Sequence, residues 1–176
     1  MTIYIVRHGQ TEENLRHILQ GHMPGTLTEE GQGQVRAAAD RLASEQIDFR
    51  CVVTSDLKRA VNSAGIISER LGIPVVPHPI LRERDWGKYT GMPVMEAKEK
   101  YYHDGRWDFP DSAETDEQIL ARAGKALDML EQEYGDSNII IVTHGQFARN
   151  MIAATRSCSY HDVPSFVNAE IRILNI

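Results

Sequence analysis

The chain has 176 residues, of which 41% are hydrophobic and 25% charged, and its formal net charge at pH 7 is −6. This length suits one domain with a substantial apolar core, and the composition is typical of a globular enzyme or binding domain. The negative charge argues against general attraction to nucleic acid or to an anionic membrane surface. Any anion site must therefore be a local concentration of Arg, Lys, His and backbone N–H groups.

The two cysteines, Cys51 and Cys158, lack the close spacing of a zinc site, so we expect two reduced thiols. No apolar run approaches the ~18 residues of a membrane span. The N-terminal residues also lack the charged, apolar and cleavage regions of a signal peptide. We expect a cytoplasmic protein with no membrane partner.

The first predicted element is the apolar run TIYIV at residues 2–6, which is typical of a strand buried on both faces. A helical pattern follows from Thr28, then a second apolar strand at 49–55. Another helical pattern begins at Asp56 and stops at Gly72. The run IPVVPH at 73–78 has prolines close to both ends, which favours an edge or terminal strand.

The segment 82–114 is the least regular part of the chain and contains both tryptophans. Such an insertion can shape a pocket at one end of a sheet, although a surface loop with an aromatic cluster is the alternative. A helix then begins at Thr115 with a capping-box spacing. The last three predicted elements are the strand NIIIVTH, a helix after His144 and the alternating strand AEIRILNI. This alternation predicts an α/β fold with a mainly parallel sheet.

Two predicted strands end in the same pattern, IVRHG and IVTHG. Parallel strands end at one edge of a sheet, so we expect His8 and His144 to be neighbours at a ligand-binding edge. A metal site would need a third ligand, and no such spacing is present. Arg7 would repel a cation and has the geometry to bind a phosphate group. We therefore predict an anion site and no metal.

A second arginine supports the anion site. Arg59 lies in the first turn of the helix that follows the strand at 49–55. Free N–H groups and the dipole at a helix N-terminus favour negative charge. Its neighbour Lys58 is expected to be a solvated surface residue.

Five motifs occur in an order that strongly resembles the histidine phosphatase superfamily, also called the phosphoglycerate mutase-like family. They are RHGQTEEN, LTEEG, TSDLKRAVNSA, LRERDWGKYTG and THG. The resemblance covers nearly the whole chain. It implies a three-layer sandwich with a mainly parallel central sheet, formed by a single domain over 1–176 with a substrate-shaping insertion at about 82–114. It also implies a phosphoryl-transfer enzyme with a phosphohistidine intermediate and no metal or other cofactor.

The resemblance assigns roles to individual residues. His8 matches the nucleophile, and Arg7, Arg59 and His144 match the phosphate pocket. Glu83 matches the proton donor to the leaving oxygen. The residues expected to bind substrate are Asn14, Gln20, Gly21, Gly145 and Gln146.

Two of these substrate-binding positions carry alternatives. Asn14 matches a phosphate ligand but is also suited to a helix-cap or turn role beside Thr11. Gln146 stands where the family commonly has a glycine, so its side chain can contact substrate and alter specificity.

The chemistry fits these residue types. A neutral imidazole is a competent nucleophile when one ring nitrogen is tied down, and the Gly9 carbonyl is a plausible acceptor. Two arginines and a second, charged histidine would neutralise the phosphate oxygens without magnesium. Glu83 must carry a proton to act as an acid, and inward-pointing Arg82 and Arg84 would lower its pKa. The rival carboxylates are Glu12, Glu13 and Asp85.

Three departures from the mutases of the family favour water as the phosphoryl acceptor. Val94 stands where those mutases carry a lysine, and only Arg106 stands where they carry an arginine pair. The segment between Glu83 and His144 is also short. We expect a phosphatase that takes a small phosphorylated substrate and releases inorganic phosphate; α-ribazole phosphate, sugar phosphates and small phosphoesters are all candidates. A small mutase and a non-catalytic phospholigand-binding regulator remain as alternatives.

Overall fold

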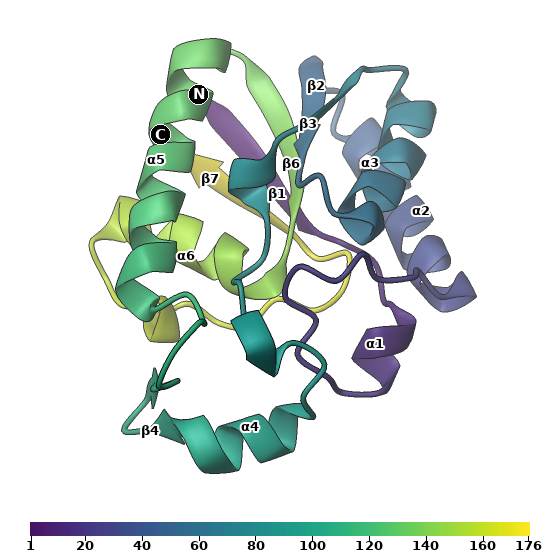
Figure 1. The fold of residues 1–176 in the computed structure, drawn as a ribbon. Coiled ribbons are helices and arrows are strands. Elements are labelled where there is room, and N and C mark those ends of the chain that lie inside the picture. The colour runs from purple at the N-terminus through teal and green to yellow at the C-terminus, as the bar shows by residue number, and fades with distance from the viewer.

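The computed structural model describes residues 1–176, and a five-stranded sheet lies at its centre (Figure 1). Strand β7 runs antiparallel to β1, while all other neighbouring strands are parallel. The mainly parallel sheet is therefore confirmed. In spatial order the strands are β3 (Val75–Pro77), β2 (Phe49–Thr54), β6 (Asn138–Thr143), β1 (Thr2–Arg7) and β7 (Ile171–Asn175).

Helices cover both faces of the sheet and make three layers (Figure 1). Ile3 and Ile5 pack with helices α5 (Asp116–Tyr134) and α6 (Gly145–Arg156), whereas Tyr4 and Val6 pack with α2 (Glu29–Ser44) and α3 (Lys58–Leu71). Because successive side chains of a strand point to opposite faces, a strand covered on both sides is a continuous apolar run. The predicted three-layer α/β sandwich is confirmed.

The predicted helix boundaries have the expected local causes. Thr115 and Gln118 form a reciprocal capping box at the start of α5. Gly72 ends α3 in the left-handed region, with φ 69°. Strand β3 lies at an edge of the sheet and has 3 residues, as its flanking prolines predict.

The segment after β1 packs closely against the beginning of α2. A Cβ atom on Gly9 would lie 2.3 Å from the carbonyl oxygen of Gly31, so only glycine permits this approach. The chain then forms the short helix α1 (Glu12–Leu15), which Thr11 caps. This packing fixes the backbone on both sides of the first His-Gly pair.

The segment 82–114 is more ordered than the sequence indicates. It contains a 3-10 turn (Gly87–Tyr89), helix α4 (Val94–Tyr101) and the two short strands β4 (Tyr102–His103) and β5 (Arg106–Trp107). Helix α4 was not predicted, because 8 residues give too little periodicity and too little intrinsic helix stability. It is held by a small apolar cluster, separate from the two main cores, that includes Leu19, Trp86, Tyr89 and Ala97.

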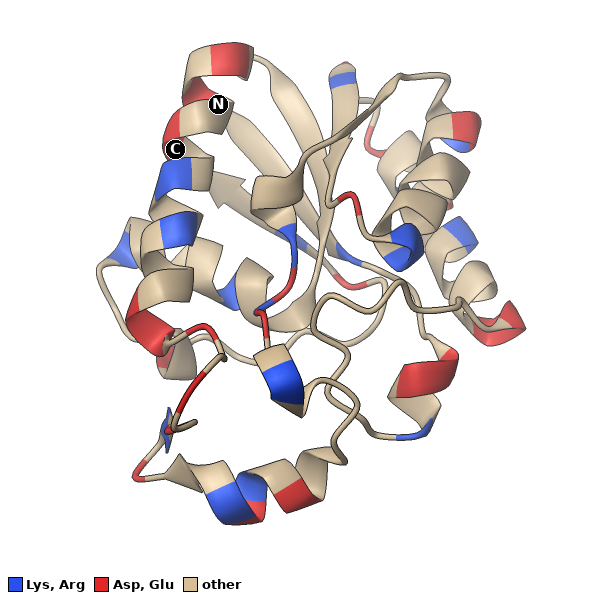
Figure 2. Cartoon of the chain, viewed as in Figure 1, with Lys and Arg blue, Asp and Glu red and all other residues tan.

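Acidic and basic residues are both spread over the chain, although the only charged residues of α1 are acidic and those of α6 are basic (Figure 2). No helix is both long enough and apolar enough to pass through a bilayer. Cys51 is buried, Cys158 is partly buried, and both are free thiols.

Candidate active site

The two His-Gly pairs meet at one edge of the sheet. Strands β1 and β6 are paired in parallel with Arg7 opposite Thr143, so the next residue of each strand is a histidine. The His8 backbone N–H donates to the Thr143 carbonyl at 3.0 Å. The ring centroids of His8 and His144 lie 5.2 Å apart. The expected adjacency of the two histidines is confirmed.

Arg59 reaches the same place from the first turn of α3. Its Nε donates to His8 Nε2 at 3.3 Å, and its Nη2 donates to the Gly21 carbonyl at 2.9 Å. Nη1 donates to the Met23 carbonyl. The side chain is 1% exposed, and burial lowers its pKa to about 10, which leaves it charged at neutral pH. Arg59 therefore connects the nucleophile candidate to the loop around Gly21, while Lys58 is exposed as expected.

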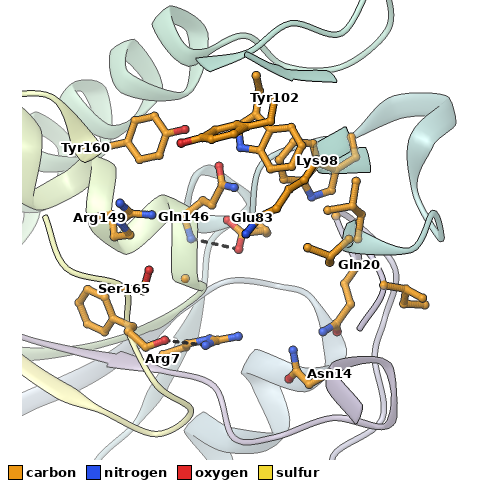
Figure 3. A pocket seen from close by; sticks show the side chains of 18 of the residues that line it. Arg7, Asn14, Gln20, Glu83, Lys98, Tyr102, Gln146, Arg149, Tyr160 and Ser165 are labelled. Carbon is orange, nitrogen blue, oxygen red and sulfur yellow. Dashed lines mark hydrogen bonds between the residues drawn. The ribbon is translucent and has the colours of Figure 1, made fainter. Parts of the chain in front are cut away.

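A cavity of about 690 Å³ opens over these residues (Figure 3). All of the sequence-predicted site residues line it except His144, which is fully buried beside His8. We call the group Arg7, His8, Arg59 and His144 the inner end of the cavity. We call the group Trp86, Lys98, Tyr102, Trp107, Arg149 and Tyr160 the outer wall; all six residues line the cavity.

The hydrogen bonds of His8 determine which ring nitrogen carries the proton. Nδ1 lies 2.8 Å from the Gly9 carbonyl, and a carbonyl can only accept, so Nδ1 is the donor. The Nε2 lone pair then faces Arg59 and the cavity. Burial, followed by the charges of Arg59 and Arg7, holds the pKa of His8 well below its usual value. His8 is therefore a neutral imidazole with Nε2 unprotonated.

His144 differs from the expectation of a charged histidine. Burial lowers its pKa well below the usual value, and the positive charge of Arg59 adds to this effect. Both of its ring nitrogens are buried without a hydrogen-bond partner, as is Arg7 Nε. Buried polar groups of this kind are normally satisfied, and an anion would accept hydrogen bonds from Arg7 Nε and from the single N–H of the neutral His144 ring.

Arg7 forms the floor of the cavity at the end of β1. Its Nη1 donates to the Phe166 carbonyl at 2.6 Å, a bond drawn in Figure 3. Burial lowers the pKa of Arg7, while Glu83 and Glu170 act in the opposite direction. The first turn of α6 packs against this guanidinium, because a Cβ atom at Gly145 would lie in van der Waals contact with Arg7 Nε, at 3.5 Å.

Glu83 is the only carboxylate that lines the cavity. It accepts hydrogen bonds from the backbone N–H groups of Phe147 at 3.0 Å and Gln146 at 3.2 Å, at the N-terminus of α6. The Arg84 N–H donates to it at 3.0 Å. The rival carboxylates Glu12, Glu13 and Asp85 do not line the cavity.

The two arginines that flank Glu83 are held elsewhere. Arg82 forms a bidentate pair with Asp56, with distances of 2.6 and 2.5 Å. Arg84 bonds to Asp116 at 2.5 Å and is 1% exposed. Neither guanidinium donates to the Glu83 carboxylate, so the inward orientation considered in the sequence analysis does not occur.

Asn14 combines a structural contact with exposure to the cavity. Its Oδ1 accepts from the Thr11 N–H at 3.1 Å and from Asn168 Nδ2 at 3.2 Å, which leaves its amide nitrogen on the cavity side (Figure 3). Thr11 also donates through Oγ1 to Gln20 Oε1 at 3.1 Å. Asn14 thus takes part in the helix cap and also lines the cavity, while its role as a phosphate ligand stays a prediction.

Two cations in the outer wall, Lys98 and Arg149, were not predicted from the sequence. Val94 and Lys98 lie one turn apart on α4 and both line the cavity, as does Tyr102, the residue that follows the helix. Arg149 lies one turn after Gly145 on α6. The Lys98 signal depended on predicting α4, whereas Arg149 was recognisable from its spacing to the second His-Gly pair.

The structure contains no group of three or more His, Cys, Asp or Glu side chains that could hold a metal ion. The donors around His8 are two guanidiniums and a second imidazole, a set suited to an anion. The arrangement can bind a phosphate group beside an unprotonated imidazole nitrogen and a single carboxyl group.

The chain matches the family model described as histidine phosphatase superfamily (branch 1) over residues 3–176. A Bacillus subtilis relative, named uncharacterized phosphatase PhoE, is 35% identical over 147 residues, or 81% of this chain and 71% of that protein. An Arabidopsis thaliana relative, named metal-independent phosphoserine phosphatase, is 29% identical over 183 residues, or 99% and 76%. The solved mycobacterial glucosyl-3-phosphoglycerate phosphatase complexed with VO3 has a TM-score of 0.87 at 26% identity, covering 99% of this chain and 92% of that one. Phosphoglycerate mutases are also among the relatives.

Proposed function

Because the chain belongs to the histidine phosphatase superfamily (branch 1), we propose that it is a metal-independent phosphomonoesterase with a phosphohistidine intermediate on His8. Its substrates in this proposal are small phosphorylated metabolites. The observation that carries the proposal is the state of His8, whose Nδ1 donates to Gly9 and whose Nε2 lone pair accepts from Arg59 at the inner end of a cation-lined cavity.

In the first half-reaction, His8 Nε2 attacks the phosphorus atom and forms an N–P bond. The bond between phosphorus and the leaving oxygen breaks, and Glu83 donates a proton to that oxygen. The assignment of Glu83 is supported by its being the only carboxylate that lines the cavity. General acid catalysis of this kind requires a carboxyl group within reach of the leaving oxygen.

In the second half-reaction, water attacks the phosphorus atom and the N–P bond breaks. Glu83, now ionised, accepts the proton of the water, and inorganic phosphate leaves. His8 returns to the neutral tautomer that its bond to Gly9 holds. Each residue ends the cycle in its starting state.

Charge neutralisation in this proposal comes from the inner end of the cavity. Arg7 and Arg59 lie where they can contact the equatorial oxygens of the phosphoryl group, and phosphoryl transfer depends mainly on such positioning and electrostatics. A bound dianion opposes the effect of the two arginines on His144, so it raises the pKa of that imidazole. His144 can then donate a hydrogen bond to phosphate.

The nucleophile is tested by rapid quenching during turnover of a phosphomonoester labelled in the phosphoryl group. We expect an acid-labile phosphoenzyme in the wild type and none in His8→Ala, whose phosphate release falls by at least about 10⁴-fold. His103→Ala is the control, because His103 is an exposed histidine outside the cavity. Label that persists in His8→Ala would place the nucleophile elsewhere.

The remaining features are tested in the same assay. EDTA should leave phosphate release unchanged, whereas loss of activity with rescue by a divalent ion would contradict metal independence.

The mutase alternative predicts that 3-phosphoglycerate is isomerised faster than orthophosphate appears. A non-catalytic regulator would bind phosphate esters but release phosphate from no member of a broad panel.

A further inference from the structure

The segment 80–83, which ends in Glu83, is held by side chains from other elements of the fold. Arg122 on α5 donates to three of its four backbone carbonyls, at 2.8, 2.8 and 3.3 Å. Thr143, at the end of β6, donates to the fourth carbonyl at 2.7 Å, and His22 adds a second contact to the Glu83 carbonyl at 3.0 Å. Because buried backbone carbonyls need partners, these side chains determine the path of the segment.

Arg122 has no N–H group left for any other ligand. Its Nε and Nη2 donate to the Glu114 carboxylate at 2.8 and 2.7 Å, and the bonds to the segment 80–83 use the remaining hydrogens. The side chains of Arg122 and Glu114 are 22% and 13% exposed, so the ion pair is mostly shielded from water. A guanidinium whose donors are all satisfied in this way is fixed in one orientation.

The same guanidinium also contacts α6. It lies 4.4 Å from the centre of the Phe147 ring, and the Phe147 backbone N–H donates to the Glu83 carboxylate at 3.0 Å. The neighbouring Gln146 N–H donates to that carboxylate at 3.2 Å (Figure 3). Arg122 therefore touches both the backbone that carries Glu83 and a residue that binds its carboxyl group.

Arg122 and Glu114 lie outside the cavity, since neither residue lines it. Any effect of this pair on the reaction must therefore pass through Glu83. The reach of the Glu83 carboxyl group depends on how the segment 80–83 is placed against α6. A displacement of about 1 Å is enough to weaken acid catalysis strongly, because proton transfer requires hydrogen-bond distance.

We propose that Arg122, oriented by Glu114, is a positioning residue that sets where the Glu83 carboxyl group lies against the N-terminus of α6. This inference rests on the proposed function, because it takes Glu83 to be the group that protonates the leaving oxygen. Arg122 does not contact the substrate; loss of its fork lets the segment 80–83 shift and moves the acid away from that oxygen. Lysine at this position keeps the charge but cannot donate to a carboxylate and three carbonyls at once.

The proposal is tested with two esters that differ in their need for an acid. The 4-nitrophenolate ion leaves readily without a proton, whereas the alkoxide of benzyl alcohol is a strong base that needs one. We define the leaving-group ratio as kcat/KM for 4-nitrophenyl phosphate divided by kcat/KM for benzyl phosphate. Glu83→Gln should raise this ratio by at least about 10²-fold, and Arg122→Lys should raise it by about tenfold. A purely structural role would lower both values of kcat/KM equally and leave the ratio unchanged.

Arg172→Lys is the matched control, because Arg172 has the same kinds of partner elsewhere in the fold. It pairs with Glu170 at 2.6 Å, donates to two backbone carbonyls at 2.7 Å and lies 3.8 Å from the centre of the Phe166 ring. The Phe166 carbonyl accepts from Arg7, so this substitution should leave the leaving-group ratio unchanged whatever it does to both rates. A rise equal to that of Arg122→Lys would overturn the proposal.

Glu114→Gln is a milder second variant, which decides the matter if Arg122→Lys does not fold. It keeps the shape of the side chain and removes its charge, so the leaving-group ratio should rise about threefold. If Glu83→Gln raises the ratio but neither of these variants does, the positioning role is overturned and the assignment of Glu83 stands. If Glu83→Gln leaves the ratio unchanged, the assignment of Glu83 fails and this inference fails with it.

Crystal structures of the variants decide the question even if the protein releases phosphate from neither ester. In Arg122→Lys, or in Glu114→Gln if that variant alone folds, the Glu83 carboxyl group should lose at least one of its hydrogen bonds to Gln146 and Phe147. A carboxyl group that keeps both bonds would overturn the proposal.

Discussion

The inner end of the cavity and its outer wall are held by different kinds of structure. His8 and His144 follow paired central strands, and both side chains are buried. The outer wall comes mainly from the segment 82–114 and from residues around Tyr160, with Trp86 packed in a small separate cluster. Catalytic side chains must be held in a fixed geometry, which burial between packed elements provides. Residues that select a leaving group can lie on a more exposed surface.

The exposure of several side chains differs between the two regions in the same way. At the inner end, burial and neighbouring charge lower the pKa of both histidines. In the outer wall, Lys98 is exposed and Tyr102 and Trp107 are only partly buried. Substitutions at the inner end should therefore affect catalysis strongly, and those in the outer wall should mainly affect substrate preference.

Apart from substitution of His8 itself, the largest effect is expected at Arg59. Arg59→Met should lower kcat/KM by about 10² to 10³-fold, because it removes a donor to the phosphoryl group and a contact to the Gly21 loop. It should also move the acid limb of the pH profile upward, since the positive charge of Arg59 lowers the pKa of His8. Lys58→Met, an exposed neighbour, is the control. An acid limb that stays in place would contradict the proposed coupling to His8.

A smaller effect is expected on stability against acid. Burial holds the pKa values of His8 and His144 in the folded protein well below 6.5, the usual value of an imidazole, so below about pH 6.5 the unfolded chain binds more protons than the folded one. The free energy of unfolding should fall with decreasing pH by up to about 1.4 kcal/mol per pH unit for each histidine. Thermal melts between pH 7 and pH 5 measure this slope.

His144→Asn should make that slope shallower, because it removes one of the two buried imidazoles. His103→Asn should not, because His103 is exposed in the segment that forms the outer wall. Saturating inorganic phosphate should reduce the slope in the wild type, since an anion favours the protonated imidazole. If both substitutions changed the pH dependence of the free energy of unfolding equally, the proposed difference between the inner end and the outer wall would be contradicted.

The smallest effect is expected in the outer wall. Trp107→Ala should reduce kcat/KM by about three- to tenfold for substrates that contact the wall, the range expected for loss of one aromatic contact. The melting temperature should change little, because Trp107 is only partly buried and packs against the separate cluster. Met95→Ala is the control, since Met95 is 74% exposed on α4. A loss as large as that of Arg59→Met would remove the distinction between the two regions.

Much of the fold was predictable because its signals are local. The continuous apolar runs that became β1 and β6 are typical of strands covered on both faces, and the capping box at Thr115 marked the start of α5. The repeated His-Gly pair located the inner end, since parallel strands finish at one edge. The motif resemblance added Glu83 to the predicted site residues. In the structure Glu83 is held at the N-terminus of α6 by hydrogen bonds from residues that lie 63 and 64 positions further along the chain.

The outer wall was not predictable in the same way. Helix α4 is too short to have clear periodicity, and Ala97 is buried only because Leu19 and Trp86 surround it. From the sequence, Lys98 therefore could not be distinguished from an ordinary surface lysine; only the packing of α4 places it at the cavity. Arg82 and Arg84 were open to either orientation until Asp56 and Asp116 were brought close.

The sequence by itself determined the layered α/β fold, the neighbouring histidines and the anion-binding character of the site. These depend on the order of apolar runs, on helix caps and on where strands end. Tertiary structure decided the tautomer of His8, the absence of charge on His144 and the exposure of Lys98 and Arg149 to the cavity. Those properties arise from burial and from partners distant in the chain, neither of which short-range sequence patterns contain.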